Sequence, residues 1–222
     1  MKTLIKNLIA KTGYTIVKKH PFNPQEALPL TKEYFLDLYF SLVKDPFFVQ
    51  IGAYDGYTAD PIHNFVTKYR LKGICVEPQP DAFRKLQETY RKYPNVKCVN
   101  ALIGDKPFYA VKDSGIATFN KKRLEAKGLE IEEIHPPITS LNRLLQDVEK
   151  VDFLQIDTEG YDYEILKMVD FNKFNPRIIN LESHYFNDET RLKCEKLLTD
   201  NDYRFFRDKS DTCAYKTGSK DY

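Results

Sequence analysis

The chain has 222 residues, which is enough for one domain with a sizeable core. Its 42% hydrophobic and 30% charged residues are typical of a folded globular protein. The net charge is only +2, so no strong overall field attracts nucleic acid or an anionic membrane, and a dedicated nucleic-acid binder is not expected.

The four cysteines are far apart in the sequence and form no Cys-x-x-Cys pair for zinc or redox chemistry. Those at 75 and 98 lie in apolar runs, as buried reduced thiols do. The first residues, MKTLIKNLIAKTGYTIVKK, lack the apolar run of a secretory signal, and no stretch has transmembrane length. We therefore expect a cytoplasmic protein without a transmembrane segment.

Residues 1–45 are predicted to form an N-terminal helical extension, and residues 46–222 the main domain. Leu4, Ile5, Leu8 and Ile9 would form one apolar stripe on a first helix. That helix would dock on its own domain or on a partner, or else lie on a membrane surface. A Pro-rich connector follows, and then an amphipathic helix over 31–43.

The main domain alternates apolar runs with amphipathic segments, which indicates a mostly parallel sheet covered by helices on both faces. The predicted helices cover 60–70, 80–93, 141–148, 161–169 and 188–201. The predicted strands are FFVQIGAY, GICVEP, VKCVNALIG, DFLQID and RIINLESH, with FYAV as a short partner of the third. The final segments YRFFRD and TCAYK read as two strands joined by a turn.

Residues 112–137 have an irregular pattern between two of these strands. A structureless stretch of this length inside a domain is often a functional lid. Ser114, Gly115 and Thr118 are therefore candidates to contact a cofactor or an acceptor.

Ligands of open parallel sheets bind beyond the carboxyl ends of the strands. At the first such end, Gly52-Ala53-Tyr54-Asp55-Gly56 lets the backbone turn sharply and approach a ligand. This G-x-x-x-G pattern is not the G-x-G-x-x-G of dinucleotide enzymes. Glu77 closes the next strand, where an acid can accept hydrogen bonds from both ribose hydroxyls. Together these residues favour a nucleoside ligand that carries a carboxylate and no pyrophosphate, such as S-adenosylmethionine.

The segments VQIGAYDG, VEPQPDAFRKL, VNALIGD and FLQIDTEGYDYEIL together resemble the FkbM family of methyltransferases. The resemblance runs from about Phe47 to about His184, and its most specific part is Ile156-Asp157-Thr158-Glu159-Gly160-Tyr161, which is similar to the family signature Lys-Ile-Asp-x-Glu-Gly. Gln155 stands where the family commonly has lysine, and Tyr54 where it commonly has asparagine.

The resemblance implies an α/β, Rossmann-like class I methyltransferase fold, with a seven-stranded, mostly parallel sheet that ends in an antiparallel strand pair. It implies S-adenosylmethionine as cofactor and a hydroxyl on a sugar, a polyketide or another small molecule as acceptor. By the match, Gly52, Ala53, Tyr54, Asp55 and Gly56 surround the methionine part of the cofactor. Glu77 binds the ribose, and the residues beside the adenine are Pro78, Gln79, Asn100 and Ala101.

An alcohol acceptor must lose a proton, which requires a nearby base or a metal ion. Asp157 and Glu159 follow the fourth strand, and Glu182 and His184 end the fifth, where residues two apart share a face. His184 is the candidate base because imidazole titrates near neutral pH. In the less favoured alternative, Asp157, Glu182 and His184 bind a divalent cation that acidifies the acceptor.

Three other functions remain open at this stage. The acceptor could be a macromolecule, RNA or protein, although a near-neutral chain without a basic stripe argues against RNA. The domain could also be a non-catalytic Rossmann-like interaction module. An NAD-dependent oxidoreductase is disfavoured because the third glycine of the dinucleotide pattern is missing.

Overall fold

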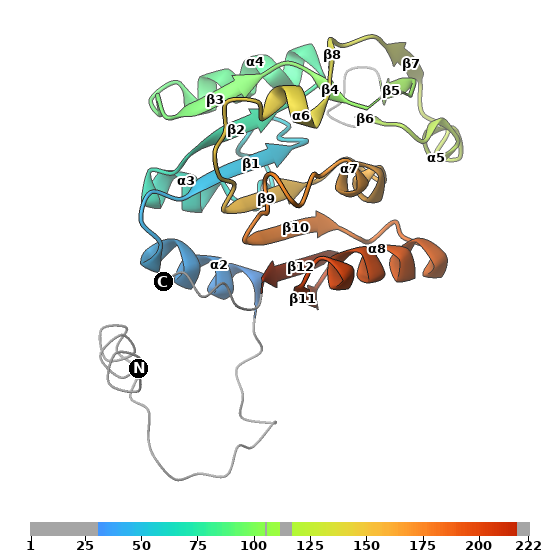
Figure 1. The fold of residues 1–222 in the computed structure, drawn as a ribbon. Helices are drawn as coiled ribbons and strands as arrows, with labels where there is room; N and C mark the ends of the chain where they lie inside the picture. Colours follow the sequence, from blue (N-terminus) through green and yellow to red (C-terminus); the bar gives the residue numbers. More distant parts are fainter. Residues whose placement is uncertain (1–30, 105, 112–116, 217–222) are drawn as a thin grey trace, which may run out of the picture. The chain divides into compact units, whose positions relative to one another are not determined.

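The computed structural model describes residues 31–104, 106–111 and 117–216 (Figure 1). The predicted helix and connector before residue 31, together with Ser114 and Gly115, lie outside the described residues. The chain divides into two units, Met1–Thr31 and Lys32–Tyr222. The second unit therefore includes the segment 32–45, which the sequence analysis assigned to an extension. Among the described residues, no helix is long and apolar enough to cross a membrane.

The centre of the second unit is a seven-stranded sheet (Figure 1). Five strands run parallel, and the last two form an antiparallel hairpin at one edge. This confirms the predicted fold class and the terminal strand pair. Across the sheet the order is β11 (Tyr203–Asp208), β12 (Asp211–Lys216), β10 (Ile178–Glu182), β9 (Phe153–Ile156), β1 (Phe47–Ile51), β2 (Lys72–Val76) and β3 (Val96–Val99).

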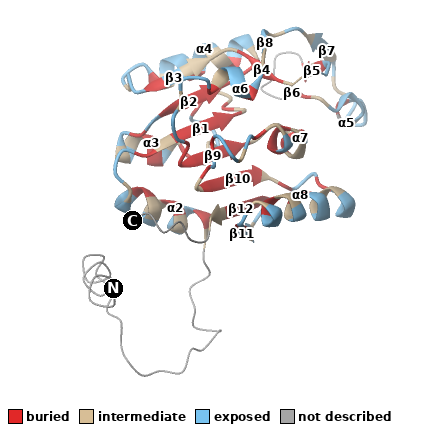
Figure 2. Cartoon of the chain, in the orientation of Figure 1, coloured by how far each residue is buried: buried red, intermediate tan, exposed pale blue. Residues whose placement is uncertain are grey.

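Helices cover both faces of the sheet, and the strands between them are largely buried (Figure 2). Alternate residues of a strand point to opposite faces, and apolar residues on each face pack against the helices. Phe48 of β1 and Phe153 of β9 face one group of helices, whereas Val49 and Leu154 face the other. The first group is α2 (Lys32–Leu42), α3 (His63–Tyr69) and α4 (Pro80–Tyr90). The second group is α6 (Leu141–Leu144), α7 (Asp162–Lys167) and α8 (Asp188–Asp200).

The third predicted strand is wrong in its second half. The chain leaves the main sheet after β3, and Leu102–Ile103 forms a separate strand, β4, which pairs with β8 (Ile138–Thr139). At the break, the side-chain amide of Asn100 donates to the carbonyls of Glu77 (2.8 Å) and Pro78 (3.1 Å), which ties the chain to the end of β2.

The segment predicted to be irregular contains regular structure. Ala117–Thr118 (β6) and Ile131–Ile134 (β7) pair on either side of β5 (Phe108–Val111), and α5 (Lys121–Glu125) lies between them in sequence. The strand FYAV therefore belongs to this antiparallel sheet and is not a partner of β3. We call β5, β6 and β7 the inserted sheet.

Candidate active site

A cavity of about 380 Å³ lies at the carboxyl ends of β1, β2 and β9. One wall comes from the main sheet, and another comes from Phe108, Ala117 and Phe119 of the inserted sheet and the residue after it. Of the residues predicted from the sequence to bind a cofactor or to act in catalysis, eight line this cavity: Gly52, Tyr54, Glu77, Pro78, Gln79, Ala101, Asp157 and Glu159.

Gly52 allows two strand ends to approach each other. Its φ is +82°, and a Cβ atom placed there would lie 1.7 Å from the carbonyl oxygen of Asp157. The amides of Gly52 and Ala53 both donate to the carbonyl of Val76, 3.0 Å away in each case. This glycine therefore contacts the ends of both β2 and β9 at the cavity wall.

The rest of the glycine turn is held by its own hydrogen bonds. The carboxylate of Asp55 accepts from the amides of Tyr57 (2.9 Å) and Thr58 (2.7 Å) and from the hydroxyl of Thr58 (2.7 Å). Gly56 has a φ of +68° and packs against Leu86 and Tyr90. Ala53, Asp55 and Gly56 are not among the residues that line the cavity, so their contribution is to shape the turn.

Glu77 is the most buried carboxylate of the cavity wall, with 3% of its surface exposed. One of its oxygens accepts from the amide of Tyr54 (2.8 Å) and the other from the amide of Gln79 (2.9 Å). Burial raises the pKa of Glu77 to about 7, and the charge of Asp157 acts in the same direction, against the effect of these two hydrogen bonds. Each oxygen keeps a further lone pair, so the carboxylate can still accept from two ligand hydroxyls.

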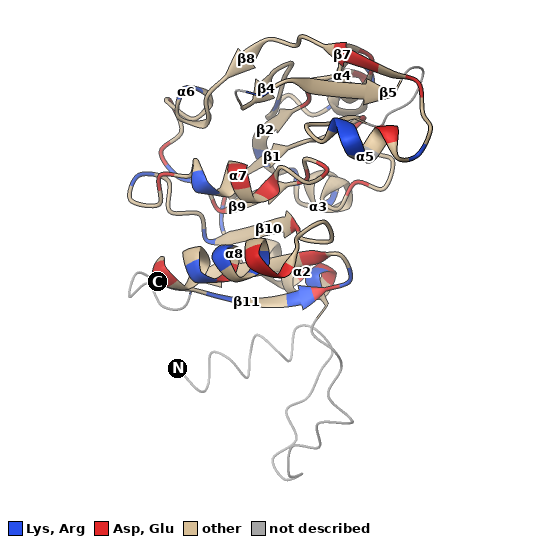
Figure 3. Cartoon of the chain, turned by 90° about the vertical axis from the view of Figure 1, so that its right-hand side faces the viewer, with Lys and Arg blue, Asp and Glu red and all other residues tan. Residues whose placement is uncertain are grey.

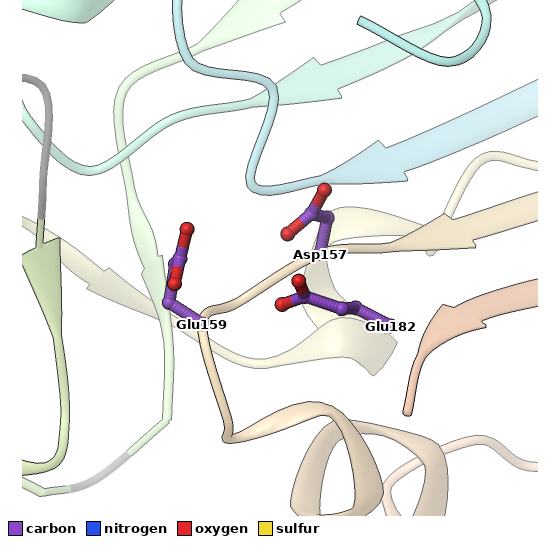
Figure 4. Close-up of side chains that lie close together, drawn as sticks. All are labelled: Asp157, Glu159 and Glu182. Atoms are coloured by element: carbon purple, nitrogen blue, oxygen red, sulfur yellow. The ribbon is translucent and has the colours of Figure 1, made fainter. Parts of the chain in front are cut away.

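Three carboxylates converge at the carboxyl ends of the neighbouring strands β9 and β10 (Figure 4). β9 and β10 pair in parallel, and oxygens of Asp157, Glu159 and Glu182 lie within 4.8 Å of one another. Burial, followed by the charges of neighbouring acids, raises the pKa of Asp157 to about 7 and that of Glu182 to about 8. Carboxylate oxygens at this spacing could take up a proton or hold a hard divalent cation.

His184 lies apart from these three carboxylates. The strand β10 ends at Glu182, so His184 falls in the following turn and not on the face that it was expected to share with Glu182. Its side chain is exposed, and its ring lies 5.0 Å from that of Tyr185 between centroids. Among the described residues, the group that could bind a cation contains Glu159 in place of His184.

A buried polar row runs beneath Asp157. Gln155, at the position where the family commonly has lysine, accepts a hydrogen bond from Asn180 (2.9 Å), and Asn180 also donates to Asp211 (2.9 Å). Asp211 is ion-paired with Lys32 at the start of α2. The positive charge in this row therefore comes from Lys32, and it opposes the rise in the pKa of Asp157.

Sequence reasoning missed part of the cavity wall. Thr58, Ala59 and Thr158 lie next to predicted residues, and their place in the same loops was the available signal. Phe108 and Phe119 come from the inserted sheet and its end, which the sequence pattern did not reveal. The predicted candidate Thr118 is described: it is buried, and its hydroxyl donates to the carbonyl of Glu159.

Charged residues of both signs are interspersed on the face shown in Figure 3, along α8 and along α7, which has acids in its first turn and Lys167 in its last. Asp162 and Glu164 lie in the first turn of α7. The surroundings of the three carboxylates are therefore acidic, in a chain whose net charge is close to zero.

Comparison with known proteins identifies the family. The model of the methyltransferase FkbM domain matches residues 50–215. A search of curated protein sequences finds no match. Among solved structures, the methyltransferase FkbM from Methylobacillus flagellatus KT aligns with a TM-score of 0.51 at 16% identity, over 79% of this chain and 45% of that one. The METTL16 methyltransferase domain aligns with a TM-score of 0.50 at 12% identity, over 98% and 79%.

These structural likenesses show the fold, and the family match covers most of the chain, including the glycine turn, Glu77 and the three carboxylates. The chain belongs to the FkbM family of methyltransferases, as an S-adenosylmethionine-dependent enzyme.

Proposed function

We propose that this methyltransferase transfers the methyl group of S-adenosylmethionine to a hydroxyl of a sugar or another small, uncharged molecule. The observation that carries the proposal is that Glu77, Asp157 and Glu159 line the same cavity. Glu77 is suited to bind the ribose, and Asp157 and Glu159 are suited to the sulfonium end of the donor. The glycine turn lies between these two ends, where the methionine part would be held. The predicted cofactor residues that line the cavity keep their roles in the proposal: Gly52, Tyr54, Glu77, Pro78, Gln79 and Ala101. Ala53, Asp55 and Gly56 act by shaping the turn.

The proposed reaction is an in-line displacement. The acceptor hydroxyl gives its proton to a carboxylate, its oxygen forms a bond to the methyl carbon, and the carbon–sulfur electron pair stays on sulfur as S-adenosylhomocysteine leaves. Asp157 is the proposed base, because it lines the cavity and its pKa of about 7 matches neutral operation. His184 is exposed and outside the cavity lining, so the geometry favours Asp157 for this step.

A second cavity supports a small hydroxylated acceptor. It has a volume of about 550 Å³ and lies between α2, α3 and the turn that joins β11 to β12. Ala59 lines both cavities. Lys32 and Lys68 line the second cavity, each ion-paired with a carboxylate of the same wall, Asp211 and Asp37. Each ammonium has further N–H groups, which can donate to the oxygens of a polyhydroxylated molecule.

The acidic residues at the reacting end of the cavity disfavour phosphate-rich acceptors. Phosphate-rich acceptors such as RNA gain affinity mainly from cationic side chains, whereas the reacting end of this cavity carries Asp157 and Glu159.

The four cysteines are free, which fits a reducing compartment such as the cytoplasm, and we propose that location.

Calorimetric titration with S-adenosylmethionine, S-adenosylhomocysteine and NAD tests the proposal. Both S-adenosyl ligands should bind and NAD should not. Glu77→Ala should weaken binding by about 1.5–3 kcal/mol, the value of hydrogen bonds to a charged group. The control is Glu88→Ala, which removes an exposed carboxylate from α4 and should change nothing. Folded protein that binds neither S-adenosyl ligand would contradict the proposal.

The acceptor is then sought by following transfer of labelled methyl to a panel of free sugars, glycosides and simple polyols, with RNA and protein included. Asp157→Asn should abolish transfer and still bind S-adenosylhomocysteine, and His184→Ala should retain most of the activity. If His184→Ala loses methyl transfer and Asp157→Asn keeps a normal rate, His184 and not Asp157 is the general base. Transfer to RNA or protein alone would exclude the small-molecule acceptor.

A further inference from the structure

Thr118 connects the inserted sheet to the loop that follows β9, residues 158–160. Its hydroxyl lies 2.8 Å from the carbonyl oxygen of Glu159 and 3.1 Å from the amide nitrogen of Asn120. Since a carbonyl can only accept and an amide N–H can only donate, the hydroxyl proton must point to Glu159. Only 1% of Thr118 is exposed, so water cannot readily replace either partner.

The residue that Thr118 holds has an unfavourable backbone conformation. Glu159 has a φ of +56°, in the left-handed region, which costs free energy in a residue with a Cβ atom. Such a conformation persists only where the surrounding structure fixes it. Here the groups that fix the conformation of Glu159 lie on both sides of the loop 158–160.

On one side, the buried carboxylate of Asp162 accepts from the amides of Thr158 (3.3 Å) and Gly160 (3.1 Å). On the other side, Thr118 donates to the carbonyl between those two amides. The residue after Thr118, Phe119, stacks on Tyr161 with ring centroids 3.9 Å apart and interplanar angle 26°. The loop 158–160 is therefore clamped between α7 and the inserted sheet.

The consequence is seen at the carboxylate of Glu159. With the backbone held in this conformation, the side chain faces those of Asp157 and Glu182 (Figure 4). Rotation of the loop into an ordinary conformation would turn the carboxylate away from this group, because φ sets the direction of the Cα–Cβ bond.

We infer that Thr118 is a positioning residue: its hydroxyl holds Glu159 in the left-handed conformation that directs the Glu159 carboxylate to the sulfonium end of the donor site. The identity of the ligand in this inference rests on the proposed function. The hydrogen bond by which Thr118 fixes Glu159 rests on the geometry alone. It gives the inserted sheet a role in the reaction beyond forming a wall, and it gives Thr118 a role through Glu159 in place of the direct cofactor contact that the sequence suggested.

The first test uses hydrogen exchange of the full chain without ligand. Thr118→Val keeps the shape and removes the hydroxyl, and Thr118→Ser keeps the hydroxyl. Exchange at residues 158–161 should become roughly tenfold faster in Thr118→Val and return to the wild-type rate in Thr118→Ser. Thr199→Val is the matched control, since it removes another hydroxyl-to-carbonyl bond of 2.8 Å, in α8. Unchanged exchange in Thr118→Val would overturn the inference.

The second test compares S-adenosylmethionine, whose sulfur is positively charged, with S-adenosylhomocysteine, whose sulfur is neutral. Thr118→Val should lower the affinity for the charged ligand roughly fivefold more than for the neutral one, as a displaced carboxylate requires. Thr118→Ser should restore the ratio, and Thr118→Val should have no further effect on it in a Glu159→Gln background. An equal loss for both ligands would show a merely structural role and overturn the inference.

The two tests separate the two proposals. If the wild-type chain binds neither ligand, the proposed function fails, and the exchange measurement still decides whether the hydroxyl clamps the loop. If Thr118→Val is too unstable to measure, Thr118→Ala and Thr118→Ser are compared instead, because alanine and serine differ by the hydroxyl alone.

Discussion

At the scale of single residues, the protonation of Glu77 should control cofactor binding. Its pKa is raised to about 7 by burial, so at pH 6 most molecules carry a neutral carboxyl group that donates one proton and accepts less well. The ionised form, which prevails above pH 7, can accept from both ribose hydroxyls. The affinity for S-adenosylhomocysteine should therefore rise between pH 6 and pH 8 by up to about tenfold in total, because the ionised fraction rises about tenfold over that range.

Calorimetric titrations across that range check this dependence. Glu77→Gln cannot ionise and should bind more weakly with a flatter profile, because the neutral amide has one acceptor oxygen. S-adenosylhomocysteine is the appropriate ligand because its sulfur is uncharged and does not respond to the charge of Asp157. An affinity that is constant from pH 6 to pH 8 in the wild type would disprove the role given to Glu77.

Gly52 provides a second prediction at this scale. A methyl group at this position would lie 1.7 Å from the carbonyl of Asp157, and φ is +82°, so Gly52→Ala must separate β1 from β9 as well as strain the backbone. We expect the free energy of unfolding to fall by about 3 kcal/mol or more. Gly128→Ala is the control: its φ is also positive, at +65°, but no atom lies within 4 Å of the added carbon. Chemical denaturation of both variants separates the steric clash from backbone strain, and equal losses would show that the close approach costs little.

At the scale of elements, α2 should contribute to the stability of the domain. Leu36 is fully buried in the same cluster as Phe48 and Phe153, whereas Leu38, on the same helix, is 38% exposed. Leu36→Ala should lower the free energy of unfolding by about 2–5 kcal/mol, and Leu38→Ala by much less, since a partly exposed residue leaves no buried void. Denaturant titration of both variants measures the difference. A Leu36→Ala chain as stable as the wild type would mean that α2 does not belong to the cooperative unit.

The elements also show what the sequence could predict. The parallel strands are short apolar runs that end at glycine, proline or an acid, and these signals predicted β1, β2, β9 and β10 with their ligand-facing ends. In the inserted sheet β5 gave a strand signal as the run FYAV, but its partners gave none, because β6 has only two residues and β7 presents Glu132 and Glu133 within its four. Its pairing joins segments separated in sequence, which no local pattern encodes.

The same reasoning explains the partial prediction of the three carboxylates. Asp157 and Glu159 follow one strand and Glu182 ends its neighbour, so their convergence followed from strand order. His184 was placed with them by the alternation of a strand, but the chain turns at Ser183, where the amide of Phe186 donates back to the Ser183 carbonyl. Alternation applies only within the strand, and the sequence did not reveal its last residue.

At the scale of the whole molecule, charge is unevenly distributed between surface and interior. Acids and bases nearly balance over the chain, at 32 and 34 residues. At the ligand end of the sheet, however, Glu77, Asp157, Asp162 and Glu182 are withdrawn from water, with Lys32 as a nearby cation. Burial raises the pKa of every one of these four acids, to about 7 for the first two and about 8 for the other two. The site therefore carries less negative charge near neutral pH than its composition suggests.

This distribution predicts how stability depends on pH. Each of the four acids binds its proton more tightly in the folded chain than in the unfolded chain, where the pKa is about 4. Between pH 4 and pH 8 the folded state therefore holds more protons, and the contribution of these groups to stability falls as pH rises. The melting temperature should be higher at pH 5.5 than at pH 8.5. Glu182→Gln should reduce the difference, because the amide no longer titrates, whereas Glu189→Gln, an exposed acid on α8, should leave it unchanged. Thermal unfolding at both pH values measures this, and a wild-type melting temperature that rises toward pH 8.5 would show that these acids are already ionised and compensated in the folded chain.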